Sequence, residues 1–310
     1  MVLPVLDNRI SNAAPATSGG VTIWLGTEST SYTTANNWSL RVPVNGDRVF
    51  FTDSTRDVAD TFQNSVVLEE FRVGPNYGGK IGEGGISPGL VINAKTMVFG
   101  SAKCSISMIP KVQDLHILAM PRQCFLGNGT LIKRLFIHTT TGELLFTGAA
   151  ATRDVFIAPG SSTVKMPDSQ VGVADGGTTT APAVRVGRGN RLVSACDLRD
   201  ARISGTLEHI KGTVNTPQTY GKQSQIISSG PTIEVLEMFG GSLILADEPS
   251  DTTLGTNLGS FATLSLTGDI YDGRIITDKS NRRITHPKSG LDVRGENLIK
   301  LASGQTVTLT

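Results

Sequence analysis

Residues 86–166 decide the fold, and they read ISPGLVINAKTMVFGSAKCSISMIPKVQDLHILAMPRQCFLGNGTLIKRLFIHTTTGELLFTGAAATRDVFIAPGSSTVKM. Hydrophobic residues recur in this stretch at intervals of 20. The first such set comprises Ile86, Ile106, Leu126, Phe146 and Met166. A second set stands two residues earlier and comprises Cys104, Cys124, Leu144 and Val164. An i, i+2 relation is what one face of a β-strand requires, so we expect both sets to point into the protein.

Three further sets share this spacing and give each repeat two more strand positions. They comprise Met97, Ile117, Ile137 and Ile157, then Leu115, Leu135 and Val155, and then Ile92, Val112 and Ile132. Three short inward-facing strands per repeat, each stacked on its equivalent, describe a β-solenoid. An antiparallel sandwich with evenly spaced strands is the alternative, but several sets in one register favour the solenoid. We therefore predict an all-β, single-stranded, right-handed parallel β-helix with coils of about 20 residues.

The composition agrees with an all-β chain and excludes two classes of partner. The 310 residues include 35 glycines and 14 prolines, and no window shows a helical apolar stripe. Charged residues are only 18% of the chain and balance to a net charge of +1. No overall field would attract nucleic acid or an anionic membrane, so we expect neither as a partner. Aromatic residues make up only 5%, which leaves few rings for a sugar-binding cleft.

Changes in the hydrophobic pattern divide the chain into four segments. Residues 1–20 lack a periodic apolar face and are predicted to be a flexible N-terminal arm. Residues 21–310 are predicted to form one β-helix domain: a cap at 21–60, regular coils at 61–166, and irregular coils with loop insertions at 167–310. The N-terminus has no basic region followed by an apolar run, so we expect synthesis in the cytoplasm without a secretory signal.

Residues 37–47 carry a resemblance to a known kind of protein. They contain Asn-Trp-Ser, then Val-Pro, then Asn-Gly-Asp before a Val-Phe-Phe strand. The segment resembles the opening coil of many bacterial and phage β-helical surface proteins. A cap is needed there because the first coil has an exposed strand edge. Trp24 and Trp38 are accordingly interpreted as cap residues and not as sugar platforms.

No catalytic, cofactor-binding or metal-binding residue is predicted from the sequence. Acids near the C-terminus stand in sequences typical of turns, where Asp bonds its own backbone. These acids are Asp247, Glu248, Asp251, Asp269, Asp272 and Asp278. The histidines, none with metal-ligand spacing, are His116, His138, His209 and His286, and the first two are expected to face outward.

The remaining candidates are contact residues and thiols. Tyr77, in a Gly-rich loop, is predicted to be an exposed contact residue for a partner. Arg185, Arg188 and Arg191 form a basic cluster that we interpret as a solvated turn, with an acidic partner surface as the alternative. Two further basic pairs occur at Lys133-Arg134 and Arg282-Arg283. The cysteines are Cys104, Cys124 and Cys196, and we expect the first two to be buried free thiols.

A capped, glycine-rich β-helix with an arm and no cofactor motif resembles the β-helical decoration, or cement, proteins and tail proteins of tailed bacteriophages. The resemblance implies a non-enzymatic virion protein on the capsid surface. It implies a homotrimer whose partners are the major capsid protein or other virion proteins, with the capsid lattice stabilised by binding. A carbohydrate-binding or depolymerising tailspike is the first alternative, and a secreted adhesin is the second.

Overall fold

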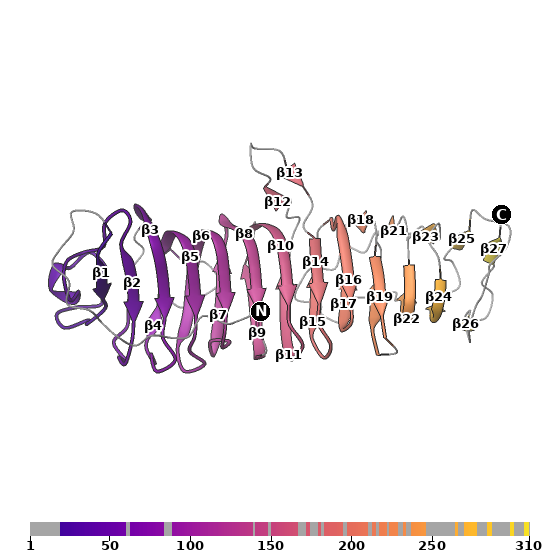
Figure 1. Ribbon diagram of the computed structural model, residues 1–310, viewed down its shortest axis with the longest axis horizontal. Coiled ribbons are helices and arrows are strands. Elements are labelled where there is room, and N and C mark those ends of the chain that lie inside the picture. Colours follow the sequence, from indigo (N-terminus) through magenta and orange to yellow (C-terminus); the bar gives the residue numbers. More distant parts are fainter. Residues whose placement is uncertain are drawn as a thin grey trace.

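The computed structural model describes residues 19–59, 63–83, 89–138, 140–147, 150–166, 183–194, 197–209, 217–221 and 223–228, with shorter strand segments between residues 172 and 309. These residues form a long all-β stack whose strands lie across its long axis (Figure 1). Among them there is no α-helix, and a single 3-10 turn spans Ala35–Asn37. The predicted arm lies outside the described residues except for Gly19 and Gly20.

Register divides most strands among three faces, which we call faces A, B and C. Face A consists of β1 (Val21–Ile23), β2 (Arg48–Phe51), β14 (Ala183–Val186), β16 (Asp200–Ile203), β19 (Pro217–Tyr220) and the C-terminal parts of β3 (Gln63–Val73), β5 (Val91–Phe99), β6 (Ser105–Ile117), β8 (Thr130–Ile137) and β10 (Ala150–Ile157). All these pairs are parallel, as the solenoid prediction requires.

Face B follows face A along the chain. It consists of β4 (Lys80–Ile81), the start of β6, β7 (Gln123–Gly127), β9 (Thr141–Thr147), β11 (Ser161–Met166), β15 (Arg191–Ser194), β17 (Thr206–His209), β20 (Gln225–Ser228), the later parts of β22 (Glu237–Leu245) and β24 (Ile270–Thr277), and β26 (Leu298–Lys300). The first residues of β22 and β24 continue face A.

Face C closes each coil. It consists of the first parts of β3 and β5, the middle of β6, and the first parts of β8 and β10. Later in the chain, a separate five-stranded parallel sheet contains β18 (Thr213–Val214), β21 (Thr232–Ile233), β23 (Leu264–Ser265), β25 (Ile284–His286) and β27 (Val307–Leu309). The short strands β12 (Gly172–Val173) and β13 (Thr179–Thr180) form an antiparallel pair that projects from the stack (Figure 1). They lie in the predicted insertion after Met166.

The register confirms part of the predicted spacing and corrects the rest. Leu115 lies opposite Leu135, and Leu135 lies opposite Val155, as the predicted spacing requires. Met97, however, lies opposite Leu115 and not in one column with Ile117, so the coil at this step is shorter than predicted. The same two-residue displacement affects three other predicted sets, because Ile92 lies opposite Pro110 and not Val112, and Cys124 lies opposite Ile106 and not Cys104. Ile86, the first member of the set that contains Ile106, lies outside the described residues. A shift of two residues keeps every side chain on its own face, so the hydrophobic pattern alone does not exclude it.

Past β10 the displacement between register partners is no longer constant. Ile157 lies opposite Val186, which is a longer step than predicted, and Val186 lies opposite Ile203, which is a shorter one. Inward residues nevertheless stay opposite inward residues, because the connecting segments absorb the difference. The structure is therefore a parallel, β-helix-like stack whose coils differ in length.

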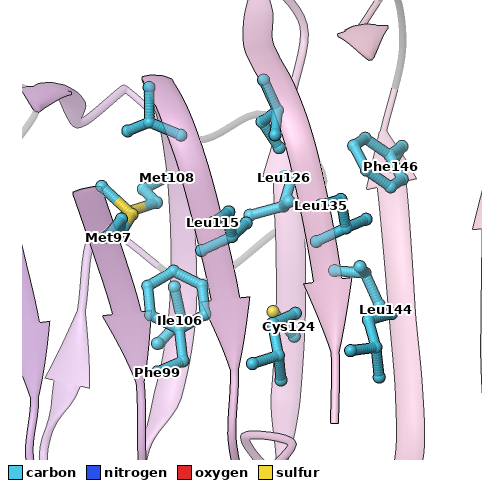
Figure 2. Packing of buried hydrophobic residues seen from close by; sticks show 14 of the residues in the cluster. Met97, Phe99, Ile106, Met108, Leu115, Cys124, Leu126, Leu135, Leu144 and Phe146 are labelled. Atoms are coloured by element: carbon cyan, nitrogen blue, oxygen red, sulfur yellow. The ribbon is translucent and has the colours of Figure 1, made fainter. Parts of the chain in front are cut away.

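Two continuous interior rows form the core. On face A the row of Phe71, Met97, Leu115, Leu135, Val155, Val184 and Ala201 is fully buried. On face B the row of Ile106, Cys124, Leu144, Val164, Leu192, Leu207 and Ile226 is at most 2% exposed. Figure 2 shows side chains of both rows lying between the ribbons of successive coils. Burial of each large aliphatic side chain contributes roughly 1.5–3 kcal/mol.

Glycines allow the sharp bends between faces. Gly100 follows face A, and its N–H donates to the carbonyl oxygen of Val73 on the preceding coil at 2.8 Å. A Cβ at this position would lie 2.7 Å from the same oxygen, so the close approach requires glycine. Gly82 has φ 83°, a conformation that side chains rarely adopt, and an added Cβ would collide with the backbone of Ser107.

Aromatic residues fill the first coils, as expected for the cap. Trp24 and Trp38 are at most 4% exposed, and their ring centroids lie 5.0 Å apart in an edge-to-face arrangement. The indole N–H of Trp24 donates to the carbonyl oxygen of Arg56, and that of Trp38 donates to the carbonyl oxygen of Tyr32. Both indoles are therefore interior residues, and neither offers an open face to a sugar, while their role as a cap stays a prediction. The boundary at residue 60 stays a prediction.

Ile137→Asp is expected to prevent folding. Ile137 is 1% exposed and lies between Ile117 and Ile157, so the substitution buries an unpaired carboxylate between coils. The expected cost is about 4 kcal/mol or more, which is a large share of a typical domain's stability. Circular dichroism and thermal unfolding would measure it. Leu131→Asp is the matched control, because Leu131 on the same strand is 42% exposed and should tolerate the exchange. Two variants of equal stability would contradict the register.

Candidate protein-interaction face

Face A carries a row of alternating charges on its outer side. In register from coil to coil this charged row contains Arg48, Glu70, Thr96, Asp114, Arg134 and Asp154. Arg134 binds Asp114 through two parallel hydrogen bonds of 2.6 Å each. Arg48 binds Glu70 at 2.7 Å. The exposed Arg134–Asp114 pair contributes less than about 1 kcal/mol and sets the charge pattern of the face more than its stability. Glu70 differs, because it is buried and also binds Arg72 at 2.6 Å.

Two residues further along each strand, a second row runs parallel to the first. This aromatic–arginine row contains Phe50, Arg72, Val98, His116, Phe136, Phe156, Arg185 and Arg202. The centroids of His116 and Phe136 are 4.7 Å apart with planes 8° from parallel, and those of Phe136 and Phe156 are 5.1 Å apart at 12°. The guanidinium carbon of Arg185 lies 5.4 Å from the centre of the Phe156 ring.

Stacking determines which parts of the side chains in the aromatic–arginine row remain exposed to a ligand. Successive strands lie about 4.8 Å apart, so rings on neighbouring strands cover one another's faces. Arg185 covers the last face of Phe156 in the same way. Ring edges and guanidinium groups are therefore presented, whereas a sugar platform requires an open ring face. A flat strip of ring edges beside arginines has the composition of a protein-interface core.

Tyr220 and Phe239 add a second exposed aromatic pair on the same face. They are 39% and 41% exposed, lie opposite each other in register, and stack with centroids 5.2 Å apart. Neither residue is among the candidates predicted from the sequence. The sequence signal for the aromatic–arginine row is the recurrence of His116, Phe136 and Phe156 at intervals of 20.

The two histidines of the regular coils meet on this face. As predicted, His116 and His138 face outward, but both are half-buried, and Nδ1 of His116 lies 3.3 Å from Nε2 of His138. Burial lowers the pKa of His116, and the neighbouring His138 lowers it further. Burial also lowers the pKa of His138. Both rings therefore favour the neutral form, in which one nitrogen donates to the other.

The predicted basic cluster is divided between different parts of the stack. Arg185 lies on face A, and Arg191 lies on face B, where it pairs with the buried carboxylate of Glu208. Arg188 stands in the turn between them and donates to the amide oxygen of Gln223 at 3.1 Å. Arg134 of the pair Lys133-Arg134 is bound to Asp114, and Arg282-Arg283 lies outside the described residues.

The prediction that Tyr77 is an exposed contact residue is wrong. Tyr77 is fully buried, with its ring centroid 5.2 Å from that of Phe51. Its hydroxyl donates to the carbonyl oxygen of Arg56 at 2.6 Å, and burial raises its pKa. The Gly-rich composition of the loop suggested exposure, but the loop turns the ring inward.

Cys104 and Cys124 are buried free thiols, as expected. Cys124 lies opposite Ile106, so the two cysteines do not share one register position as the predicted spacing implied. Burial raises the pKa of the Cys104 thiol to about 11 and also raises that of Cys124. Both thiols are therefore unreactive core residues. Cys196 lies outside the described residues.

The acids that were considered for catalysis lie in segments outside the described residues, except that Asp272 falls within β24. His209 is fully buried, and His286 falls within β25. Within the described part of the chain, no group of three or more His, Cys, Asp or Glu residues is placed to hold a metal ion. The described residues also include no helix long and apolar enough to cross a membrane.

Comparisons of the chain with protein-family models, with curated proteins and with solved structures found no match in any of the three. The class of molecule is therefore defined by its architecture: an all-β, parallel, β-helix-like stack with a patterned flat face.

The histidine pair is expected to make stability depend on pH. Because folding lowers both pKa values, the unfolded chain takes up protons first as the pH falls below about 6.5. The contribution of the pair is therefore complete above that pH and is lost as the pH falls through the lowered values. Thermal unfolding from about pH 7.5 to about pH 5 should show a steeper loss of Tm for the wild type than for His138→Gln. Equal slopes would show that the pair does not titrate on unfolding.

Proposed function

We propose that this protein is a non-enzymatic structural protein that binds a protein lattice through face A, most specifically a capsid decoration or cement protein of a tailed bacteriophage. Its partner is then the major capsid protein or another virion protein, and its working form is a homotrimer on the capsid surface. The fold proposed with it is a single-stranded, right-handed parallel β-helix, with coils of the repeat length expected from the sequence between Leu115 and Val155.

The aromatic–arginine row is the observation that carries this proposal. It spans eight register positions from Phe50 to Arg202, and at the usual strand spacing this is a strip about 34 Å long. The four-residue strands of face A make the strip about 13 Å wide, so it offers roughly 450 Å², over half of the surface that each partner buries in a standard protein interface.

The strip also suits an interface in its chemistry. Stacking holds the rings in place before binding, so little side-chain entropy is lost when a partner covers their edges. The charged row beside it contributes paired charges at the border, where complementarity selects the partner. Binding alone accounts for these features, and no chemical step is required of them.

The carbohydrate-binding alternative requires open aromatic faces. On face A these are covered by the neighbouring rings and by Arg185. The pair of Tyr220 and Phe239 is stacked face to face, with planes 6° from parallel, so each of these rings has one covered face. These contacts favour a protein partner over a glycan.

Two experiments test the proposal. Light scattering on the purified chain is expected to give the mass of three chains, in solution or on binding. Cosedimentation with heads of the phage whose genome encodes the chain is expected to show saturable binding. Failure to bind heads, together with binding to surface polysaccharide, would contradict the proposal.

A matched pair of variants locates the binding face. Phe136→Glu places a charge in the middle of the aromatic–arginine row, where hot-spot residues concentrate, and should weaken binding to heads by roughly tenfold or more. Leu131→Glu makes a comparable exchange at an exposed position of the same strand on face C and should bind like the wild type. Unchanged thermal unfolding would establish that both variants are folded. Equal losses in the two variants would contradict the assignment of face A.

A further inference from the structure

One register pair breaks the charge pattern of face A. Arg185 lies directly opposite Arg202. At the other described outward positions of this face, charged register neighbours have opposite sign, as for Asp114 and Arg134. Like charges placed opposite each other on neighbouring strands are destabilising, so this pair raises the energy of the free protein.

The two guanidinium groups stand at the end of the stacked rings. Arg185 lies over Phe156, which holds one guanidinium in place. Arg202 is 47% exposed and has Asp200 of its own strand at 3.5 Å, longer than the two Arg134–Asp114 hydrogen bonds. The next register position is the neutral Gln218. Two accessible cations about one strand spacing apart therefore continue the aromatic–arginine row.

We propose that Arg185 and Arg202 together receive a carboxylate from an acidic surface of the partner protein, an inference that rests on the proposed function of face A. A guanidinium donates in a planar fork that matches a carboxylate, and a second cation beside it adds charge complementarity. The bound carboxylate removes the repulsion between the two arginines. Docking of a protein over the neighbouring rings excludes water and strengthens the contact.

The acids on the same face select a protein carboxylate over a polyanion. The outer side of face A carries the acids Glu70, Asp114, Asp154 and Asp200. Asp200 lies on the same strand as Arg202, and Asp154 lies on the strand next to that of Arg185. A nucleic acid laid along the face would bring regularly spaced phosphates against these carboxylates. A single Asp or Glu from a shaped protein surface avoids them.

The stability of the free chain provides the first test. Arg202→Gln removes one member of the like-charge pair, so its Tm at low ionic strength should equal or exceed that of the wild type. Arg134→Gln is the matched control, because it removes an arginine that is bound twice by Asp114, and its Tm should fall. A fall in Tm for Arg202→Gln as large as that of the control would overturn the inference.

Binding of a defined probe provides the second test. A hexaglutamate peptide, with hexalysine and a DNA oligonucleotide as comparisons, would be titrated while the arginine side-chain N–H resonances are followed by NMR. The peptide should shift Arg185 and Arg202 but not Arg134, and Arg202→Gln should weaken its binding roughly tenfold. Equal shifts at all exposed arginines, or tighter binding of DNA, would overturn the inference.

Binding to phage heads separates the two proposals. If heads bind the wild type and Arg202→Gln equally well, the inference fails while the proposed function stands. If the peptide binds at the arginine pair but heads bind neither protein, the proposed function fails and the pair remains a site for an acidic protein.

Discussion

Backbone hydrogen bonds between parallel strands of successive coils fix where every side chain stands. The N–H of His138 donates to the carbonyl oxygen of Ile117, and the N–H of Ala158 donates to that of Ile137, each one coil earlier. Such bonds place equivalent residues about 4.8 Å apart along the whole stack. Interior rows, charged rows and ring stacks all follow from this single repeat, since each residue has its equivalents on the coils before and after it as neighbours.

The same constraint explains why the sequence predicts the stack of parallel strands well but the register between successive coils less well. Leu115, Leu135 and Val155 were aligned correctly because their coils have the same length. Met97 was placed one alternation away from its true neighbour, Leu115. An alternating strand looks the same after a shift of two residues, so only the turn decides the register. The coils differ between faces B and C: β6 runs on without a break, whereas the next coil has a turn between β7 and β8, and hydrophobic periodicity does not encode this difference.

The aromatic–arginine row is hard to recognise from the sequence, because its phenylalanines look like core residues. Phe136 and Phe156 are large hydrophobic residues, and such residues are usually assigned to the core. Their position beside Leu135 and Val155 places them on the outer side, where stacking stabilises them. Tyr77 shows the opposite error, because a flexible-looking loop buries its ring. In both cases the deciding contacts come from another coil, far away in the sequence.

The outer edge of β1 has a consequence for assembly. Trp38 pairs with Trp24 in an antiparallel bridge, and the N–H of Ser39 donates to the carbonyl oxygen of Ile23, so a returning segment occupies the backbone of the first strand. A parallel stack with an open end would accept further strands and extend into a filament. The antiparallel closure therefore blocks the addition of a parallel strand to face A at this end of the stack.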